Sequence, residues 1–317
     1  MHNPIERLLA VRPVAILDGA LATELERRGA DLRDPLWSAK ILLEQPDLIR
    51  AVHFDYYRAG ADIGTTATYQ ATFEGFAHRG IGKTAAADLF RRAVALAIRA
   101  RDDFWSDPAR PANRMRPLVA ASIGPYGAFM ADGSEYRGHY PVTDAVLRDF
   151  HGPRLEVLAA SGADLIACET IPCLREALVL ARLLEESTSL TAWISFSGRD
   201  GSRNCEGEDI GFCASALDRF DRIAAVGVNC TAPEYVGGLL ERMAGHTAKP
   251  LLAYPNSGER YDAAEKCWSG HPGLGTLAER SRAWYRAGAR LIGGCCRTTP
   301  GDIADLCRAH AGAEEPV

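Results

Sequence analysis

The sequence predicts a single (β/α)8 TIM barrel spanning residues 1–317, and three observations support this fold class. Eight apolar, β-branched runs recur along the chain, and helix-period segments lie between them. The runs are almost continuously apolar, which is typical of parallel strands covered on both faces. The segment "DGALATELERRG" after the first run lacks the pattern G-x-G-x-x-G that would favour an open, doubly wound nucleotide-binding sheet. Eight units favour the closed barrel over that open sheet.

Each predicted element follows from its own stretch of sequence. In chain order, the strands are expected over 13–19, 61–69, 117–125, 163–170, 190–197, 223–230, 250–256 and 289–296. Helices are expected over 46–60, 83–104, 143–162, 173–188, 233–245, 275–288 and 301–311. The phrases "RAGAD", "ASGAD" and "RAGAR" mark three helix-to-strand junctions. In each, the glycine is expected to end the helix in the left-handed conformation (Gly60, Gly162 and Gly288).

Composition excludes several functional classes. The chain is 47% hydrophobic and 24% charged, and its formal net charge is −5. No basic block is present, which argues against nucleic acid as a partner. No apolar run has transmembrane length, and the N-terminus lacks the apolar core of a signal peptide, so we expect a cytoplasmic protein without a membrane partner. The nine cysteines form no disulfide framework, because their number is odd and they are scattered over a long chain.

Polar and titratable residues recur where the apolar runs end. In a (β/α)8 barrel the active site lies at the C-terminal ends of the strands. The residues at these ends are Asp18, Thr66, Tyr69, Ser122, Glu169, Ser195, Ser197, Asn229, Cys230, Tyr254, Asn256, Cys295 and Cys296. Three long segments that follow strands, 125–142, 197–212 and 256–272, are candidate substrate lids.

Three of these residues, Cys230, Cys295 and Cys296, predict a zinc site. Strands 6 and 8 of a barrel flank strand 7, so their ends lie close enough for the three thiolates to share one ion. Three protein ligands leave one coordination position open, which is typical of a catalytic site. Gly293 and Gly294 are expected to adopt unusual dihedrals that turn both adjacent sulfurs inward. A strained Cys295–Cys296 disulfide, acting as a redox switch, is the alternative.

Six stretches together resemble the homocysteine S-methyltransferase family: "LDGALATELERRG", "SIGPYG", "ACETIP", "GVNC", "YPNSGERYD" and "GGCC". The resemblance extends from Asp18 to the helix after Cys296. It is strongest to the stand-alone members that use S-methylmethionine or S-adenosylmethionine. It is weaker to the betaine-using branch, whose members carry an additional C-terminal dimerisation segment.

The resemblance implies one Zn²⁺ per chain, homocysteine as the methyl acceptor and a sulfonium methyl donor. It implies that Asp18 and Glu169 bind the homocysteine ammonium group and that Asn256 fills the open zinc position without substrate. Asn229 would orient its loop or support the metal ligands, and no catalytic residue is expected beyond the zinc site. Thr66, Ser122 and Tyr254 are candidate pocket hydroxyls that could equally cap or pack.

Several alternatives stay open at this stage. One is a selenocysteine or other thiol methyltransferase of the same family, and another is a non-enzymatic zinc or thiol redox sensor. The oligomeric state, monomer or dimer, is not indicated, and no motif selects between the two methyl donors.

Overall fold

The computed structural model describes residues 3–32, 38–112, 114–262, 267–269 and 275–311, and its central feature is the predicted barrel. Eight parallel strands are hydrogen-bonded in the order β1-β10-β7-β6-β5-β4-β3-β2. A parallel bridge between Leu17 and Ile63 joins β1 to β2 and closes the sheet. The strands are β1 (Ala15–Ile16), β2 (Ile63–Thr65), β3 (Leu118–Ile123), β4 (Leu165–Ile171), β5 (Ala192–Phe196), β6 (Ile223–Asn229), β7 (Leu251–Tyr254) and β10 (Ala289–Ile292).

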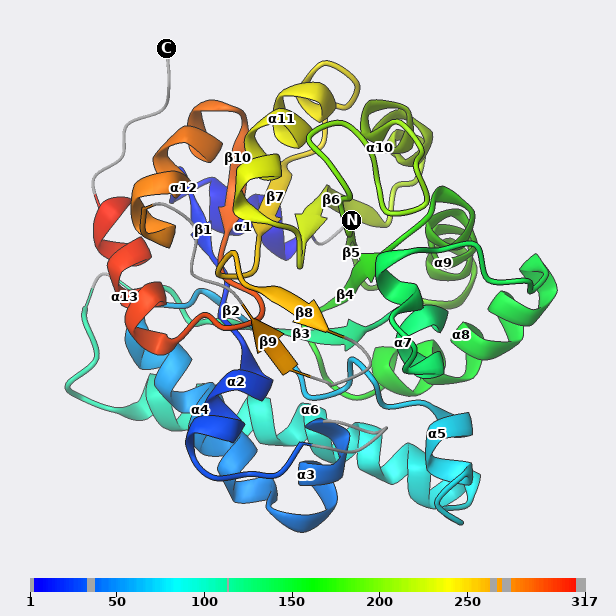
Figure 1. Cartoon of the computed structure of the whole chain (residues 1–317). Coiled ribbons are helices and arrows are strands. Elements are labelled where there is room, and N and C mark those ends of the chain that lie inside the picture. Colours follow the sequence, from blue (N-terminus) through cyan, green and yellow to red (C-terminus); the bar gives the residue numbers. More distant parts are fainter. Residues whose placement is uncertain (1–2, 33–37, 113, 263–266, 270–274, 312–317) are drawn as a thin grey trace.

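Helices surround the strands as an outer ring (Figure 1). All seven predicted helices are confirmed: α4 (Pro46–Ala59), α6 (Lys83–Ser106), α8 (Asp144–Ala159), α9 (Leu174–Ser187), α11 (Pro233–Ala244), α12 (Leu277–Arg286) and α13 (Pro300–Ala309). Glycines with positive φ end α4 at 122° and stand before β4 at 91° and before β10 at 106°, as the repeated phrase predicts. Within the described part of the chain, no helix combines the length and the apolar character that a membrane crossing requires.

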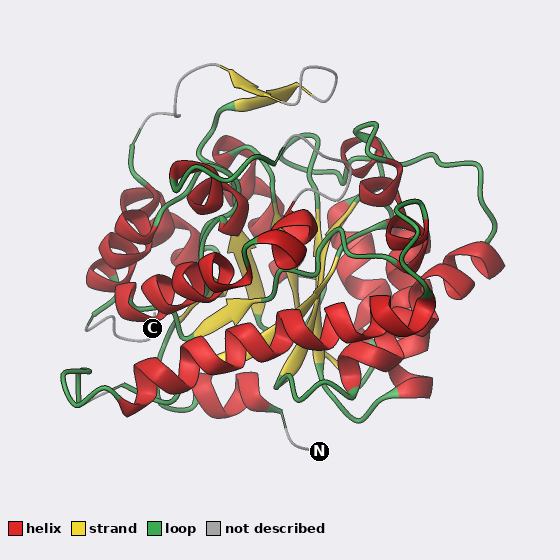
Figure 2. Ribbon diagram, turned by 90° about the horizontal axis from the view of Figure 1, so that it is seen from below, coloured by secondary structure: helices red, strands yellow, loops and turns green. Residues whose placement is uncertain are grey.

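The structure adds elements that the sequence pattern did not reveal. The additional helices are α1 (Pro4–Leu9), α2 (Leu21–Arg27), α3 (Ser38–Glu44), α5 (Phe73–Ala77), α7 (Tyr126–Met130), the 3-10 turn η1 (Ser134–Tyr136) and α10 (Ile210–Asp218). The expected lid over 256–272 contains an antiparallel hairpin, β8 (Arg260–Asp262) with β9 (Cys267–Ser269). Figure 2 shows this hairpin standing beyond one end of the barrel, and the N-terminus lies at the other end.

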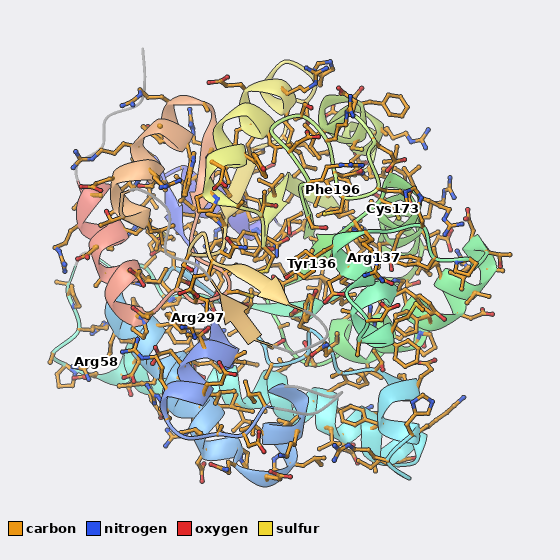
Figure 3. All side chains as sticks on the ribbon, in the orientation of Figure 1. Arg58, Tyr136, Arg137, Cys173, Phe196 and Arg297 are labelled. Atoms are coloured by element: carbon orange, nitrogen blue, oxygen red, sulfur yellow. A yellow bond between two sulfur atoms is a disulfide. The ribbon has the colours of Figure 1, made fainter. Side chains whose placement is uncertain are left out.

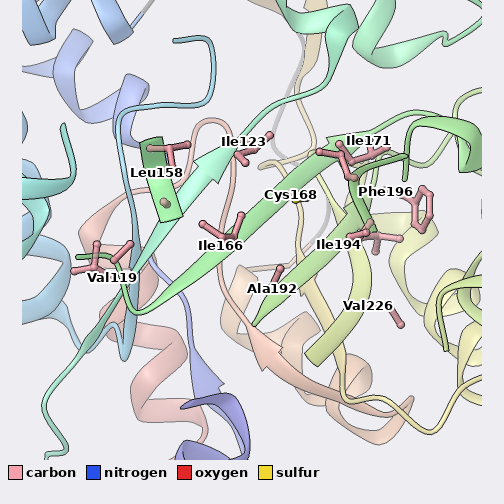
Figure 4. Close-up of a cluster of buried hydrophobic side chains, with 14 of the residues drawn as sticks. Val119, Ile123, Leu158, Ile166, Cys168, Ile171, Ala192, Ile194, Phe196 and Val226 are labelled. Atoms are coloured by element: carbon pink, nitrogen blue, oxygen red, sulfur yellow. The ribbon is translucent and has the colours of Figure 1, made fainter. Parts of the chain in front are cut away.

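Side chains alternate between the barrel interior and the layer under the helices, because successive strand residues point to opposite faces. Along β4, Leu165 and Ala167 join the interior cluster, whereas Ile166 and Cys168 pack outward. Figure 4 shows part of the outward layer, where Ile166 and Cys168 lie in the buried apolar cluster. The alternation continues to Glu169, which is therefore inward at the end of the strand.

Candidate active site

The candidate site begins with one layer of polar side chains inside the barrel. Each occupies an inward position, an even number of residues beyond an apolar inward residue of the same strand. Five strands, β3 to β7, supply this layer: Ser122, Glu169, Ser195, Asn229 and Tyr254. Each is at least nine-tenths buried. The change from apolar to polar inside the barrel thus takes place at one level, near the C-terminal ends of the strands.

A continuous hydrogen-bond network joins this layer. Ser122 Oγ donates to Glu169 Oε1, and the Tyr254 hydroxyl donates to Glu169 Oε2 at 3.1 Å. The same hydroxyl lies 2.6 Å from Ser195 Oγ, which in turn donates to Asn229 Oδ1 at 2.8 Å. Burial raises the pKa of Glu169 to about 7, although the hydrogen bonds from Ser122 and Tyr254 oppose this rise. The network fixes the direction of the Glu169 carboxylate before any ligand arrives.

Asp18 is a second buried carboxylate at the same end of the barrel. Its Oδ2 accepts from the Thr65 backbone N–H at 2.8 Å, and its Oδ1 accepts from Thr65 Oγ1 at 3.1 Å. Burial raises the pKa of Asp18 to about 8, and the nearby charge of Glu169 adds to the rise. No basic side chain pairs with either carboxylate among the described residues, so both are suited to a cationic ligand group.

The three predicted cysteines meet at the mouth of the barrel. Their Sγ atoms all lie within 4.8 Å of one another. Cys230 follows the inward residue Asn229 and would point outward in a regular strand, but its φ of 44° places it in the left-handed region and returns its sulfur to the interior. Cys230 and Cys295 are joined by a disulfide in the structure, and Cys296 is free. The alternative of a vicinal Cys295–Cys296 disulfide is therefore wrong.

The sulfur positions fit a zinc ion once the disulfide is reduced. Cys230 Sγ and Cys296 Sγ lie 3.7 Å apart. Two thiolates of a tetrahedral zinc site, each about 2.3 Å from the metal, lie about 3.8 Å apart. Among the described residues, no fourth histidine, cysteine or carboxylate joins the cluster. The donor set matches a zinc site with one open position.

The glycines before the cysteines have a different role from the one expected. Neither Gly293 nor Gly294 has a positive φ. A Cβ at Gly293 would lie 2.5 Å from Leu17 Cβ, and one at Gly294 would lie 2.2 Å from Thr298 Oγ1. The glycine pair therefore allows close backbone packing, and left-handed conformations occur instead at Cys230 and Arg297.

Comparison of the sequence with known proteins identifies the family of this chain. The family model for homocysteine S-methyltransferase matches residues 15–310. The chain belongs to the homocysteine S-methyltransferase family. It is 51% identical over 304 residues to homocysteine S-methyltransferase YbgG of Bacillus subtilis, with 96% of each chain covered. It is 48% identical over 299 residues to selenocysteine Se-methyltransferase of Brassica oleracea var. italica, covering 91% of this chain and 86% of the relative.

A solved member of the family supports the metal assignment. The metallated form of the homocysteine methyltransferase MmuM from Escherichia coli superimposes with a TM-score of 0.87 at 44% sequence identity, covering 96% of this chain and 99% of that one. In this member of the family, Cys230, Cys295 and Cys296 form the metal site, and three cysteine sulfurs are a donor set that suits Zn²⁺.

The remaining predicted residues have internal hydrogen-bond partners. Thr66 Oγ1 accepts from the Ser122 N–H at 3.1 Å and contacts Thr68 Oγ1 at 2.7 Å. Asn256 Oδ1 accepts from the Gly258 N–H at 3.1 Å. Asn229 Oδ1 accepts from the Thr170 N–H at 2.6 Å, and its amide donates to Thr170 Oγ1 at 2.8 Å. Their expected roles toward substrate and metal stay predictions.

Sequence reasoning missed two threonines of this family site. Thr65 holds Asp18, although the strand-end rule selected its neighbour Thr66. Thr170, with a φ of 61°, carries the hydrogen bonds to Asn229. Alternation from the inward residue Ile63 would have selected Thr65. No comparable sequence signal marks Thr170.

Proposed function

We propose that this chain transfers a methyl group from a sulfonium donor, S-methylmethionine or S-adenosylmethionine, to the thiolate of L-homocysteine, producing methionine. The observation that carries the proposal is the three-sulfur site in the same barrel mouth as two buried carboxylates, neither of which has a basic partner in the described part of the chain. A sulfur ligand and an ammonium group are the two ends of homocysteine that this arrangement suits.

The need for the metal follows from the acidity of the thiols. A free thiol has a pKa of about 8.5 and is mostly protonated at neutral pH. An ion of Zn²⁺ held by Cys230, Cys295 and Cys296 would lower the pKa of the substrate thiol, so that the acceptor would be available as a thiolate. Burial raises the pKa of Cys296 to about 12 in the metal-free protein, so this cysteine also needs a cation to ionise.

The chain itself binds and orients the substrate. Asp18 and Glu169 would accept hydrogen bonds from the homocysteine ammonium group, and the Ser122 and Tyr254 hydroxyls keep Glu169 in place. Methyl transfer consumes one positive and one negative charge, so a buried site from which water is excluded favours the reaction. No acid catalyst is needed, because the sulfonium leaving group departs as a neutral thioether.

A direct assay tests the proposal. Reduced, zinc-loaded protein is incubated with deuterium-labelled homocysteine and either donor, and labelled methionine is quantified by mass spectrometry. The label is required because S-methylmethionine itself becomes methionine. Formation of labelled methionine that stops after zinc chelation supports the proposal, and turnover that persists without metal contradicts it.

A selenol acceptor is the second candidate, favoured by the 48% identity to a selenocysteine Se-methyltransferase. The same sulfur cluster would bind a selenolate, and only the pocket contacts would discriminate. Competition between homocysteine and selenocysteine in the same assay gives the ratio of their kcat/KM values. We further propose that the protein works in the reducing cytoplasm on small molecules alone, since three free thiolates are needed for the metal.

A further inference from the structure

Glu135 is a buried carboxylate for which the site described above has no use. It lies in η1, within the lid segment after β3, and is only 9% exposed. Its Oε2 is buried and has no hydrogen-bond partner. Arg137, the nearest basic residue in sequence, pairs with Asp132 instead. In the described part of the chain no ion pair includes Glu135. Burial raises its pKa to about 7, although a backbone hydrogen bond and the nearby charge of Arg137 oppose this rise.

The backbone around Glu135 is held firmly. Ser197 Oγ, at the end of β5, donates to the Glu135 carbonyl oxygen at 2.8 Å. Across the turn, a Cβ at Gly127 would lie 2.6 Å from the Glu135 nitrogen, so α7 packs directly on η1. The two lid segments 125–142 and 197–212 are also joined to each other, because the His139 N–H donates a hydrogen bond to the Glu206 carboxylate at 2.7 Å. A buried carboxyl group without an ion-pair partner among the described residues is thus kept at a fixed position, where its ionisation carries a desolvation cost.

Glu135 lies at the C-terminal end of the barrel, where Ser197 binds its backbone, and it directly precedes Tyr136 in η1. Burial raises the pKa of both Tyr69 and Tyr136, and the negative charges of Glu135 and Cys296 contribute in the case of Tyr136. The negative charge of Glu135 likewise contributes to the raised pKa of Tyr69. Both tyrosines are half-buried residues. Figure 3 places Tyr136 near the centre of the ring of helices, inward of Arg137.

We propose that the Glu135 carboxylate, together with the rings of Tyr69 and Tyr136, binds the sulfonium centre of the methyl donor. The inference rests on the proposed function and deepens it by naming the residues that select a cationic donor. Asp18 and Glu169 are reserved for the homocysteine ammonium, which leaves the second cation of the reaction without a counter-ion unless Glu135 supplies it.

The chemistry of the three groups suits a sulfonium better than an ammonium. An ammonium group needs several hydrogen-bond acceptors, whereas an alkylated cation has no N–H or O–H to donate and is stabilised by aromatic faces and a nearby negative charge. Glu135, bound through Ser197 at the end of β5, and the three cysteines lie at the same end of the barrel, so a cation at Glu135 would share this mouth with the acceptor sulfur. The two sulfurs must face each other across the methyl carbon for transfer.

The transfer predicts how Glu135 affects the kinetics. A bond forms between the homocysteine sulfur and the methyl carbon, the carbon–sulfur bond of the sulfonium breaks, and its electron pair stays on the donor sulfur as a neutral thioether. Glu135 therefore stabilises the charged donor more than the transition state, in which the charge is already decreasing. Such ground-state binding lowers the KM of the donor without raising kcat.

Glu135→Gln tests this assignment, since it removes the charge at nearly constant shape. The matched control is Asp132→Asn, which removes the same charge from the exposed part of the same lid and retains an acceptor for the Ser134 N–H. For Glu135→Gln we expect the KM of S-methylmethionine to rise about 10- to 100-fold, with kcat and the KM of homocysteine changed less than about threefold. Glu135→Asp should recover part of the donor affinity, and zinc content should equal that of the wild type.

Inhibition by methionine separates a sulfonium contact from a structural role, because methionine has the same ammonium but a neutral sulfur. Its inhibition constant should be nearly unchanged in Glu135→Gln. Equal losses for methionine and S-methylmethionine, or an unchanged donor KM, overturn the inference while the proposed function stands. A wild-type protein that methylates homocysteine with neither donor overturns both.

Discussion

The Tyr254 hydroxyl donates a hydrogen bond to Glu169 Oε2 at 3.1 Å, linking β7 to β4 across the barrel. The same oxygen accepts from Trp193 Nε1 at 3.0 Å and lies 2.6 Å from Ser195 Oγ. One phenol oxygen therefore joins three strands. It also lowers the pKa of Glu169 against the effect of burial, so that the carboxylate ionises more readily.

Tyr254→Phe should weaken homocysteine binding and stability together. We expect the KM of homocysteine at pH 7 to rise about 3- to 10-fold, because the Glu169 pKa rises and a smaller fraction is ionised. The defect should shrink at pH 8.5, where the carboxylate ionises in both proteins. The buried Trp193 N–H loses its acceptor, so the free energy of unfolding should fall by about 1–3 kcal/mol. Steady-state kinetics and urea unfolding measure these effects, and Tyr235→Phe, on α11, is the matched control. A KM defect that does not depend on pH contradicts the explanation.

Asp18→Asn should weaken homocysteine binding and reduce the loss of folding stability at high pH. The folded-state pKa of Asp18 is about 8, above the value of about 3.9 for an unfolded chain. A raised pKa means that the folded protein binds the proton more tightly, so the stabilisation is complete below pH 4 and is lost as pH rises through 8. Asparagine is never ionised, and it can still accept from the Thr65 N–H. The variant should therefore lose less stability than the wild type between pH 5 and pH 9.

Urea unfolding of the reduced, zinc-free protein at pH 5, 7 and 9 measures this difference. Asp132→Asn is the control without a pH effect in this range. Hydrogen bonds from Ser134 overcome burial and lower the pKa of Asp132, so this group is ionised in both the folded and the unfolded protein from pH 5 to pH 9. The KM of homocysteine should rise more than tenfold in Asp18→Asn, since a charge-assisted contact to the ammonium is lost. Parallel pH profiles for wild type and Asp18→Asn would show that the carboxylate is not desolvated as described.

Oxidation and metal binding should exclude each other. The Cys230–Cys295 disulfide uses two of the three sulfurs that zinc requires. We expect one zinc per chain in reduced protein, none after mild oxidation, and two fewer titratable thiols in denaturant. Peptide mapping should find Cys230 linked to Cys295. Cys307→Ala, at a half-buried position on α13, should behave as wild type. Oxidised protein that still holds one zinc would contradict this expectation.

The barrel could be predicted from the sequence because its signals are local. Apolar runs, helical periodicity and the glycines that precede β2, β4 and β10 need no knowledge of distant residues. The metal site was also predictable, since eight strands in order place β6 and β10 on either side of β7. The Tyr254–Glu169 contact was not, because strand alternation indicates which face a residue occupies but not its height relative to a residue 85 positions away. Glu135 was missed for another reason. The sequence analysis selected residues at strand ends, whereas Glu135 lies in the lid segment after β3.

Gly294→Ala should damage the metal site through packing alone. A Cβ at this position would lie 2.2 Å from Thr298 Oγ1 and 2.7 Å from Thr298 Cβ, so the segment after β10 would have to move. That hydroxyl donates to the Cys295 carbonyl at 2.6 Å and therefore helps to set the position of the ligand. We expect unfolding to become easier by about 2–4 kcal/mol and zinc to dissociate at lower chelator concentration than in the wild type.

Gly237→Ala is the matched control for the same chemical change. Gly237 lies within α11, and a Cβ there meets no atom within 4 Å. Because alanine is the better helix former, this variant should gain about 0.5–1 kcal/mol and keep its zinc affinity. Chelator titrations and urea unfolding of both variants compare the two sites. If Gly294→Ala retained wild-type zinc affinity, the glycine would not be needed for the close approach of Thr298, and the packing explanation of the glycine pair would fail.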